Sequence, residues 1–294
     1  MNLLTRFTFE NHVAHGAIVE LSRGVADLLD QRSYSPDVRR LVGEAIAAMP
    51  LLATHLTAEG RINLQFQGEG AMKLLVAQVD QALNVRAMAK ADAELSGDFA
   101  QLLYGGLLAL MLEPVNAPGA EPRPASQALV LIEGARLSDA LEGYFARSEQ
   151  LPTLIRLAAG DDGRLAGFLL QRLPIEDLPN ADIEWEHLQT LASTLSSEEL
   201  LAADAGTILH RLFHAESVRV FEPRPVTVAC RCSRGGIGRM LVSLGREEVE
   251  SILAEQGRVA VTCEFCGREY VFTPLEVADL LIASGTAPST DTRH

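Results

Sequence analysis

The chain has 294 residues, of which 48% are hydrophobic and 22% are charged, so it can form one large domain with a small one, or two medium domains. Its formal net charge is −14, and an acidic surface repels phosphate backbones and anionic lipids, which argues against nucleic acids and membranes as partners. The longest apolar run, Leu107–Leu112, is too short to span a bilayer, and Met1–Phe7 lacks the basic start of a signal peptide.

The amino-terminal part begins with a short strand-like stretch, Leu4–Phe9. A helix is predicted to start at Ser35–Asp37, which supplies an N-cap serine, a proline at the first helical position and an acid in the first turn. Apolar residues then recur at helical spacing as far as Met49. We expect Pro50 to interrupt this helix and Leu51–Leu56 to continue as a further turn.

Several stretches between residue 61 and residue 171 are predicted to form strands, bounded by glycine- and proline-containing turns. The predicted strands are Arg61–Gln67, Met72–Gln78, Val85–Ala89, Leu107–Leu112, Ala128–Ile132, Ile155–Ala158 and Leu165–Gln171. A helix is predicted for Leu137–Ser148, ending before Pro152. Strands with helices between them are typical of the α+β class, so we expect an N-terminal mixed α/β-sheet domain over residues 1–180.

The strand pattern is absent from residues 183–214, where apolar residues return at helical spacing. Ser196, followed three residues later by Glu199, is the signature of a capping box and predicts one helix that continues to Phe213. We expect the apolar face of this helix to pack on the N-terminal domain. Residues 181–225 are therefore predicted to be a helical linker, with Glu216–Pro225 leading into a C-terminal domain.

Every cysteine lies in that C-terminal domain, predicted for residues 226–283 and followed by a frayed tail, 284–294. The four cysteines form two close pairs: Cys230 with Cys232, and Cys263 with Cys266. Two such pairs are typical of a tetrahedral metal site, and a Cys₄ site leaves zinc no open position for a substrate. Without an export signal, four cysteines favour a cytoplasmic location, where thiols bind metals or sense oxidants more often than they form structural disulfides.

The cysteine pattern alone leaves several functions open, and a purely structural zinc site is the one that it favours. Arg231, Arg234 and Arg239 lie beside the first pair, and we expect them to offset the negative charge of four thiolates around one Zn²⁺. The same arginines allow an alternative, a zinc ribbon that binds nucleic acid, although the chain is acidic and has no interleaved basic and aromatic residues.

A metal-dependent enzyme is the weakest alternative, because no open ligand set and no nucleophile with its base is evident. His210 and His214 have the spacing of helical metal ligands, but no glutamate follows His210 as in the zinc proteases. The run Gly235–Gly238 lacks the lysine and serine that end a phosphate-binding loop. We therefore expect a protein that is not an enzyme.

Four segments together carry a resemblance to a known family. They are the Cys-X-Cys and Cys-X-X-Cys-Gly motifs with the acidic helical spacer Glu247–Glu255 between them, and the segments Gly60–Gly70, Tyr144–Thr153 and Leu209–His214. Taken in their order along the chain, and extending over most of it, these segments resemble the redox-regulated chaperones of the heat-shock protein 33 family. One departure is Gly235–Gly238, where the family pattern has polar residues, and we expect the glycines to loosen the first turn around the metal.

The resemblance implies an ATP-independent holdase that is inactive while reduced. In that family four thiolates hold one zinc ion, which implies Cys230, Cys232, Cys263 and Cys266 as the ligands here. Oxidation would release the zinc and form the disulfides Cys230–Cys232 and Cys263–Cys266. The C-terminal domain and the linker would then unfold, and the exposed surface would bind unfolding client proteins, with a homodimer as the active form.

Overall fold

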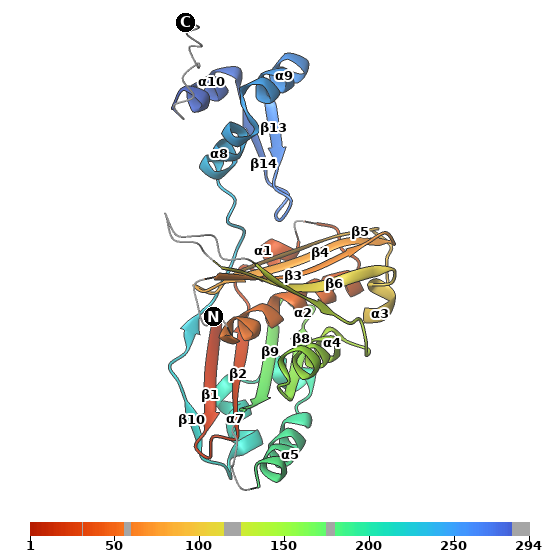
Figure 1. The fold of residues 1–294 in the computed structure, drawn as a ribbon, viewed down its shortest axis with the longest axis vertical. Helices are drawn as coiled ribbons and strands as arrows, with labels where there is room; N and C mark the ends of the chain where they lie inside the picture. The colour runs from red at the N-terminus through yellow and green to blue at the C-terminus, as the bar shows by residue number, and fades with distance from the viewer. Residues whose placement is uncertain (31, 56–59, 115–124, 175–179, 284–294) are drawn as a thin grey trace, which may run out of the picture. The chain divides into compact units, whose positions relative to one another are not determined.

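The computed structural model describes residues 1–30, 32–55, 60–114, 125–174 and 180–283 (Figure 1). The chain divides into two compact units, Met1–Ala229 and the part from Cys230 onward. The first unit holds two six-stranded sheets and the second a two-stranded sheet, with helices packed on them. The predicted α+β class is confirmed.

The first sheet is antiparallel and joins the amino terminus to residues near position 220. Its strands, in spatial order, are β10 (Val218–Val220), β1 (Leu3–Phe9), β2 (Ala14–Leu21), β9 (Leu165–Arg172) and β8 (Thr153–Ala159), with β11 (Arg224–Pro225) also pairing with β1. The register places Phe7 opposite Val220 and Leu3 opposite Pro225. The segment expected to be a linker, Glu216–Pro225, therefore contributes two short strands to this sheet.

The second sheet has long central strands and short strands at both edges. Its strands, in spatial order, are β12 (Thr227–Val228), β5 (Asn84–Ala91), β4 (Met72–Asp80), β3 (Gly60–Gly68), β6 (Gly106–Pro114) and β7 (Ser126–Val130). All neighbours are antiparallel except β12 and β5. Leu64 lies opposite Leu110 and Phe66 opposite Leu108, which gives the inner face its apolar core.

Helix α2 (Pro36–Leu52) lies between the two sheets, with all but a few of its residues buried (Figure 1). Ser35 caps it, because its hydroxyl accepts a hydrogen bond from the Val38 N–H at 3.3 Å. The helix continues through Pro50, so the predicted interruption is wrong. Pro50 lies in the last turn, where its ring removes only the hydrogen bond to the Ile46 carbonyl, and the helix ends two residues later.

Three helices cover the other face of the first sheet: α5 (Ala181–Ser193), α6 (Ser197–Ala202) and α7 (Ala205–Phe213). Phe213 packs on Phe7 and Phe9, with ring centroids 6.2 and 5.0 Å apart respectively. The prediction of one continuous helix from Ser196 is wrong, because Ala203 is extended and a second N-cap follows it. Residues 181–213 are thus part of a core that they share with the first sheet.

The remaining elements of the first unit are short helices: α1 (Val25–Leu29), the 3₁₀ turn η1 (Ala53–His55), α3 (Phe99–Leu102) and α4 (Leu137–Tyr144). The helix predicted for Leu137–Ser148 does form at its start, but it widens into a π-helical turn, η2 (Phe145–Glu149). Gln150 follows with φ of 56°, a left-handed conformation that ends the turn.

The second unit is built from α8 (Arg234–Leu244), α9 (Arg246–Gln256), the hairpin β13 (Val259–Thr262) and β14 (Glu269–Phe272), and α10 (Pro274–Ala283). The predicted frayed tail, 284–294, lies outside the described residues. Within those residues, none of the helices combines the length and the apolar character that crossing a bilayer requires.

Candidate metal centre

Two turns of the second unit bring the four cysteines together. Cys230 and Cys232 lie in the segment before α8, whose first turn is capped by the Ser233 hydroxyl. Cys263 and Cys266 lie in the tight turn between β13 and β14. That turn closes through a hydrogen bond of 2.8 Å from the Gly267 N–H to the Cys263 carbonyl, and it needs glycine at Gly267 because φ there is 66°.

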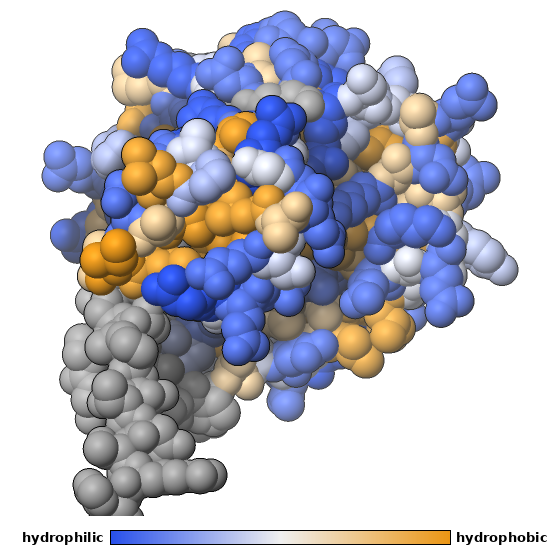
Figure 2. All heavy atoms as spheres, turned by 90° about the horizontal axis from the view of Figure 1, so that it is seen from above, coloured by the Kyte–Doolittle hydropathy of each residue, from blue (hydrophilic) through white to orange (hydrophobic). Residues whose placement is uncertain are grey.

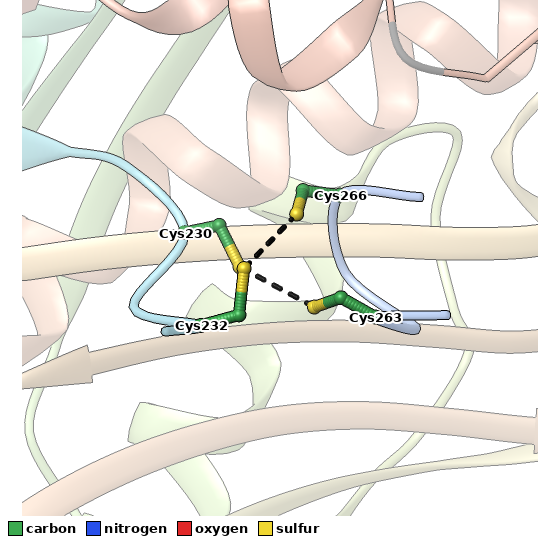
Figure 3. A group of neighbouring side chains, drawn as sticks. All are labelled: Cys230, Cys232, Cys263 and Cys266. Carbon is green, nitrogen blue, oxygen red and sulfur yellow. Dashed lines mark hydrogen bonds between the residues drawn. The ribbon is translucent and has the colours of Figure 1, made fainter. Parts of the chain in front are cut away.

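The four side chains point toward one another, two from each turn (Figure 3). The Sγ atoms of Cys230 and Cys263 are 3.6 Å apart, and those of Cys232 and Cys266 are 3.3 Å apart. All four sulfurs lie within 4.8 Å of one another, and all four cysteines are free thiols. Zinc bound to four thiolates at about 2.3 Å separates the sulfurs by about 3.8 Å, so the cluster has the size of such a site. The four cysteines are arranged to hold a metal ion.

The thiols differ in how easily they ionise. Burial raises the pKa of Cys230 and of Cys266. Burial acts in the same direction on Cys232, but hydrogen bonds from the Tyr270 hydroxyl and from the other thiols outweigh it and lower the pKa of Cys232 to about 7. One thiolate therefore forms readily at neutral pH, and a divalent cation beside it would favour the thiolate form of the other three.

Tyr270 and Arg268 belong to the centre, and the sequence analysis missed both. The Tyr270 hydroxyl donates a hydrogen bond to the Cys232 Sγ at 3.1 Å, and this bond raises the pKa of Tyr270. The pKa of Arg268 is raised by its hydrogen bond to Tyr270, and also by negative charge on Tyr270, Cys232 and Cys266. Both residues lie within four positions of Cys266, Arg268 just before β14 and Tyr270 within it. Closeness to a cysteine in the sequence is a weak signal, because it does not show which way a side chain points.

Of the three arginines predicted to offset the thiolate charge, Arg234 has other partners. Its guanidinium donates to the Glu276 carboxylate at 2.6 Å and to the Val271 carbonyl at 2.8 Å, and lies 4.3 Å from the centroid of the Phe272 ring. Arg234 thus ties α8 to β14 and α10, and its charge is paired with Glu276.

The glycine run Gly235–Gly238 forms the first turns of α8. The Gly236 N–H donates to the Ser233 hydroxyl at 3.1 Å, as in an ordinary N-cap. A Cβ at Gly238 would lie 3.0 Å from the Leu280 side chain, so the glycine lets α8 and α10 approach closely. The run is therefore explained by packing inside the second unit.

His210 and His214 do not add to a metal site. Their ring centroids are 6.0 Å apart. Within the described residues, the potential metal ligands that lie close together are the four cysteines. His210 lies in the last turn of α7, where a basic side chain suits the helix dipole.

These observations define the class to which the protein belongs: a large α+β unit joined to a small unit in which four cysteines are arranged to hold a metal ion. A sequence model of the Hsp33 protein family matches residues 2–273. The chain therefore belongs to the Hsp33 family, and the predicted resemblance is confirmed.

Curated relatives and a solved structure agree with this assignment. The 33 kDa chaperonin of Pseudomonas paraeruginosa is 40% identical, covering 98% of this chain and 97% of its own. That of Shewanella loihica is 38% identical, covering 100% of this chain and 99% of its own. The crystal structure of the 33 kDa chaperonin from Thermotoga maritima matches with a TM-score of 0.78 over 97% of this chain and 99% of that one, and at 23% identity this likeness concerns the fold. These relatives are named as chaperonins, and not as enzymes.

Proposed function

We propose that the protein is a redox-regulated, ATP-independent holdase whose reduced form binds one zinc ion through Cys230, Cys232, Cys263 and Cys266. The convergence of these four free thiols within 4.8 Å of one another is the observation that carries the proposal. A structural metal in such a site supplies about 10–16 kcal/mol of folding free energy to a small module.

Oxidation is proposed to convert the four ligands into the disulfides Cys230–Cys232 and Cys263–Cys266. Each pair of thiolates gives up two electrons as its S–S bond forms, and hypochlorous acid or a peroxide accepts them and is reduced to chloride or water. Cys232, with its pKa near 7, is the thiol that oxidants attack most readily in the metal-free form. Disulfide sulfurs no longer carry the charge that holds a cation, so the metal would be released.

The second unit depends on the metal because its own core is small. The core contains two of the cysteines themselves, Cys263 and Cys266, beside a few residues from the hairpin and the three helices. Replacing metal ligands by disulfides removes the tie between the two turns, since each proposed disulfide joins residues of the same turn. Loss of the metal is therefore expected to unfold the second unit, and heating the oxidised protein is expected to unfold the linker, 181–225, as well.

Unfolding is proposed to expose the surface that binds unfolding client proteins. Large apolar side chains already lie on the surface, and Leu275 and Ile282 of α10 are 72% and 73% exposed. Figure 2 shows hydrophobic side chains gathered in patches on the face that it draws. Release of α5–α7 would add the apolar residues that now cover Phe7 and Phe9. The proposal includes a homodimer as the active form and the cytoplasm as its location.

The experiment follows aggregation of a heat-denatured client by light scattering, with reduced and with oxidised protein. Suppression by the oxidised form alone is expected. Equal suppression by both forms, or by neither, would contradict the switch. Salt-sensitive binding to DNA or RNA would instead support the alternative of a zinc ribbon.

A further inference from the structure

The edge of the second sheet at β7 has a geometry suited to an extended polypeptide. Among the described residues β7 pairs with β6 alone and ends the sheet. In an antiparallel edge strand, every second residue directs its N–H and C=O groups away from the sheet. A hollow lies beside this strand on each face of the sheet.

The inner hollow, of about 390 Å³, lies between the end of α2, strands β3, β6 and β7, and the turn η2. Leu52, Ile62 and Phe145 are among its apolar walls. The acidic residue in its lining is Glu149, which accepts a hydrogen bond of 2.6 Å from the Tyr144 hydroxyl. A small molecule or one large side chain fits a space of this size.

The segment Tyr144–Thr153, singled out in the sequence, builds this wall. Its π-helical turn ends at Gln150 with φ of 56°, which a residue other than glycine rarely adopts. A protein keeps such a turn where it must aim particular side chains, and here the turn directs Phe145 and Glu149 to the hollow. The metal centre makes no use of this segment.

The outer hollow, of about 630 Å³, lies on the opposite face over β3, β6 and β7. Leu107, near the start of β6, and Leu129, near the end of β7, line it together and are 66% and 57% exposed. Its charged lining residue is Glu69. Each hollow thus offers apolar walls and one carboxylate, and neither has lysine or arginine among its described lining residues.

Successive side chains of a strand point to opposite faces of the sheet, and β7 itself shows this at the edge. Ala128 lies at the inner hollow and Leu129 at the outer one. A strand added beside β7 would likewise direct one side chain into the inner hollow and its neighbour into the outer one. Backbone groups, an inner hollow with apolar walls, an outer hollow in which Leu107 and Leu129 lie beside glutamines, and one carboxylate in each hollow together select an extended segment with neighbouring apolar residues and basic flanks.

We propose that β7 is the docking edge for such a segment of a non-native polypeptide, which adds to the sheet as a further strand. The inference rests on the proposed holdase function and specifies where and how an apolar client segment binds. It places binding on the first unit, so the peptide is expected to bind both redox forms, while the suppression of aggregation that oxidation switches on needs the further surface that unfolding exposes.

The test uses the full chain, reduced and oxidised, and a fluorescein-labelled peptide Lys-Thr-Leu-Val-Leu-Thr-Lys, with binding measured by fluorescence anisotropy. Two further peptides carry N-methyl groups at the odd or at the even positions. If the peptide adds to the sheet as a strand, the methyl groups of one of these peptides face β7, and this peptide should bind at least about tenfold more weakly. The other methylated peptide should bind as the parent does. Equal binding of the two methylated peptides, or no binding of the parent to either form, would overturn the proposal.

A pair of variants tests the site independently of the peptide backbone. Leu129→Lys removes an apolar wall of the outer hollow, places there a charge of the same sign as the flanks of the peptide, and is expected to weaken binding of the parent peptide about tenfold. Val220→Lys, at a residue 51% exposed on β10 of the other sheet, is the matched control and should bind as the unmodified chain does. Unchanged binding by Leu129→Lys would overturn the proposal. If the chain suppresses aggregation but fails these tests, the docking-edge proposal alone is contradicted. If the chain never suppresses aggregation, the holdase function is contradicted.

Discussion

At the scale of single residues, the hydroxyl of Tyr270 controls the reactivity of one sulfur. Its hydrogen bond of 3.1 Å to Cys232 is part of what lowers the pKa of that thiol to about 7. Tyr270→Phe removes this donor and keeps the ring. We expect the pKa of Cys232 to rise, so that metal-free, reduced protein reacts more slowly with iodoacetamide at pH 7.

The same variant should also bind zinc about 10-fold more weakly, because groups that hydrogen-bond a metal ligand contribute to affinity. Competition with a chelating dye measures this, and Tyr104→Phe, at a tyrosine 81% exposed on the first unit, is the control. Alkylation and zinc affinity that are both unchanged in Tyr270→Phe would show that the hydroxyl has no such role.

The metal ligands could be predicted from the sequence, whereas their neighbours could not. Cysteines are rare, and their spacing is itself the signal. Tyr270 and Arg268 carry no comparable signal, because tyrosine and arginine occur at many positions for other reasons. Only the turn at Gly267, which reverses the chain and lays β14 beside the sulfurs, shows that these side chains meet the centre.

At the scale of elements, the predicted strands were found and the errors concern helix ends. The apolar spacing continues without interruption from Leu200 to Phe213, so periodicity alone could not show that α6 stops at Ala202. The helix breaks because Asp204 is a second N-cap, at which a new helix begins. The capping pattern at Ser196 already predicts a helix start nearby, so a second start is not expected from the sequence. Glu199, expected to complete the capping box, instead pairs with Arg211 of α7. The position of α2 between two sheets likewise depends on tertiary structure, which spacing does not contain.

The cap at Asp204 provides a test of this break. Its carboxylate accepts hydrogen bonds from the Thr207 N–H at 2.8 Å and from the Thr207 hydroxyl at 3.1 Å. Asp204→Ala should lower the free energy of unfolding by about 1 kcal/mol, measured by urea denaturation, because the N–H loses its partner. Asp204→Asn, which keeps an acceptor, is the control and should lose less. Equal stability of Asp204→Ala and the unmodified chain would mean that α7 does not depend on its cap.

Helix α2 carries a carboxyl group whose ionisation should oppose folding. Burial raises the pKa of Glu44 to about 7, with Arg40 and Arg136 acting in the opposite direction and Asp139 adding to the rise. In the unfolded chain the pKa is the ordinary 4.5. The stabilisation is therefore full below about pH 4.5 and is lost as the pH rises to about 7, a change of at most about 3 kcal/mol.

Glu44→Gln removes this titration. We expect the variant to gain stability relative to the unmodified chain between pH 4.5 and pH 7 and to keep that gain above pH 7, as urea denaturation at a series of pH values would show. Glu198→Gln, at an exposed position on α6, is the control for the substitution itself. Parallel stability curves for Glu44→Gln and the unmodified chain would contradict the assignment.

At the scale of the whole molecule, the two units depend on different interactions. The first has two extended cores, one around α2 and the other between the first sheet and α5–α7. The second has a small core that includes Cys263 and Cys266. Removal of the metal is therefore a local event in the proposed switch, and residues 181–225 stay folded as long as their contacts with the first sheet outweigh their chain entropy.

The only tryptophan, Trp185 of α5, reports on this order of events because it is 6% exposed in the core shared with Phe168. We expect oxidation at 25 °C to release one zinc and to open tryptic sites at Arg231, Arg258 and Arg268 while the emission of Trp185 stays blue-shifted. Heating the oxidised protein should then shift that emission to the red and open sites in residues 181–225.

The reduced, zinc-loaded protein heated in the same way is the control. Early cleavage within Arg61–Val79, or a red shift that accompanies zinc release at 25 °C, would mean that the first unit is not held by its own cores.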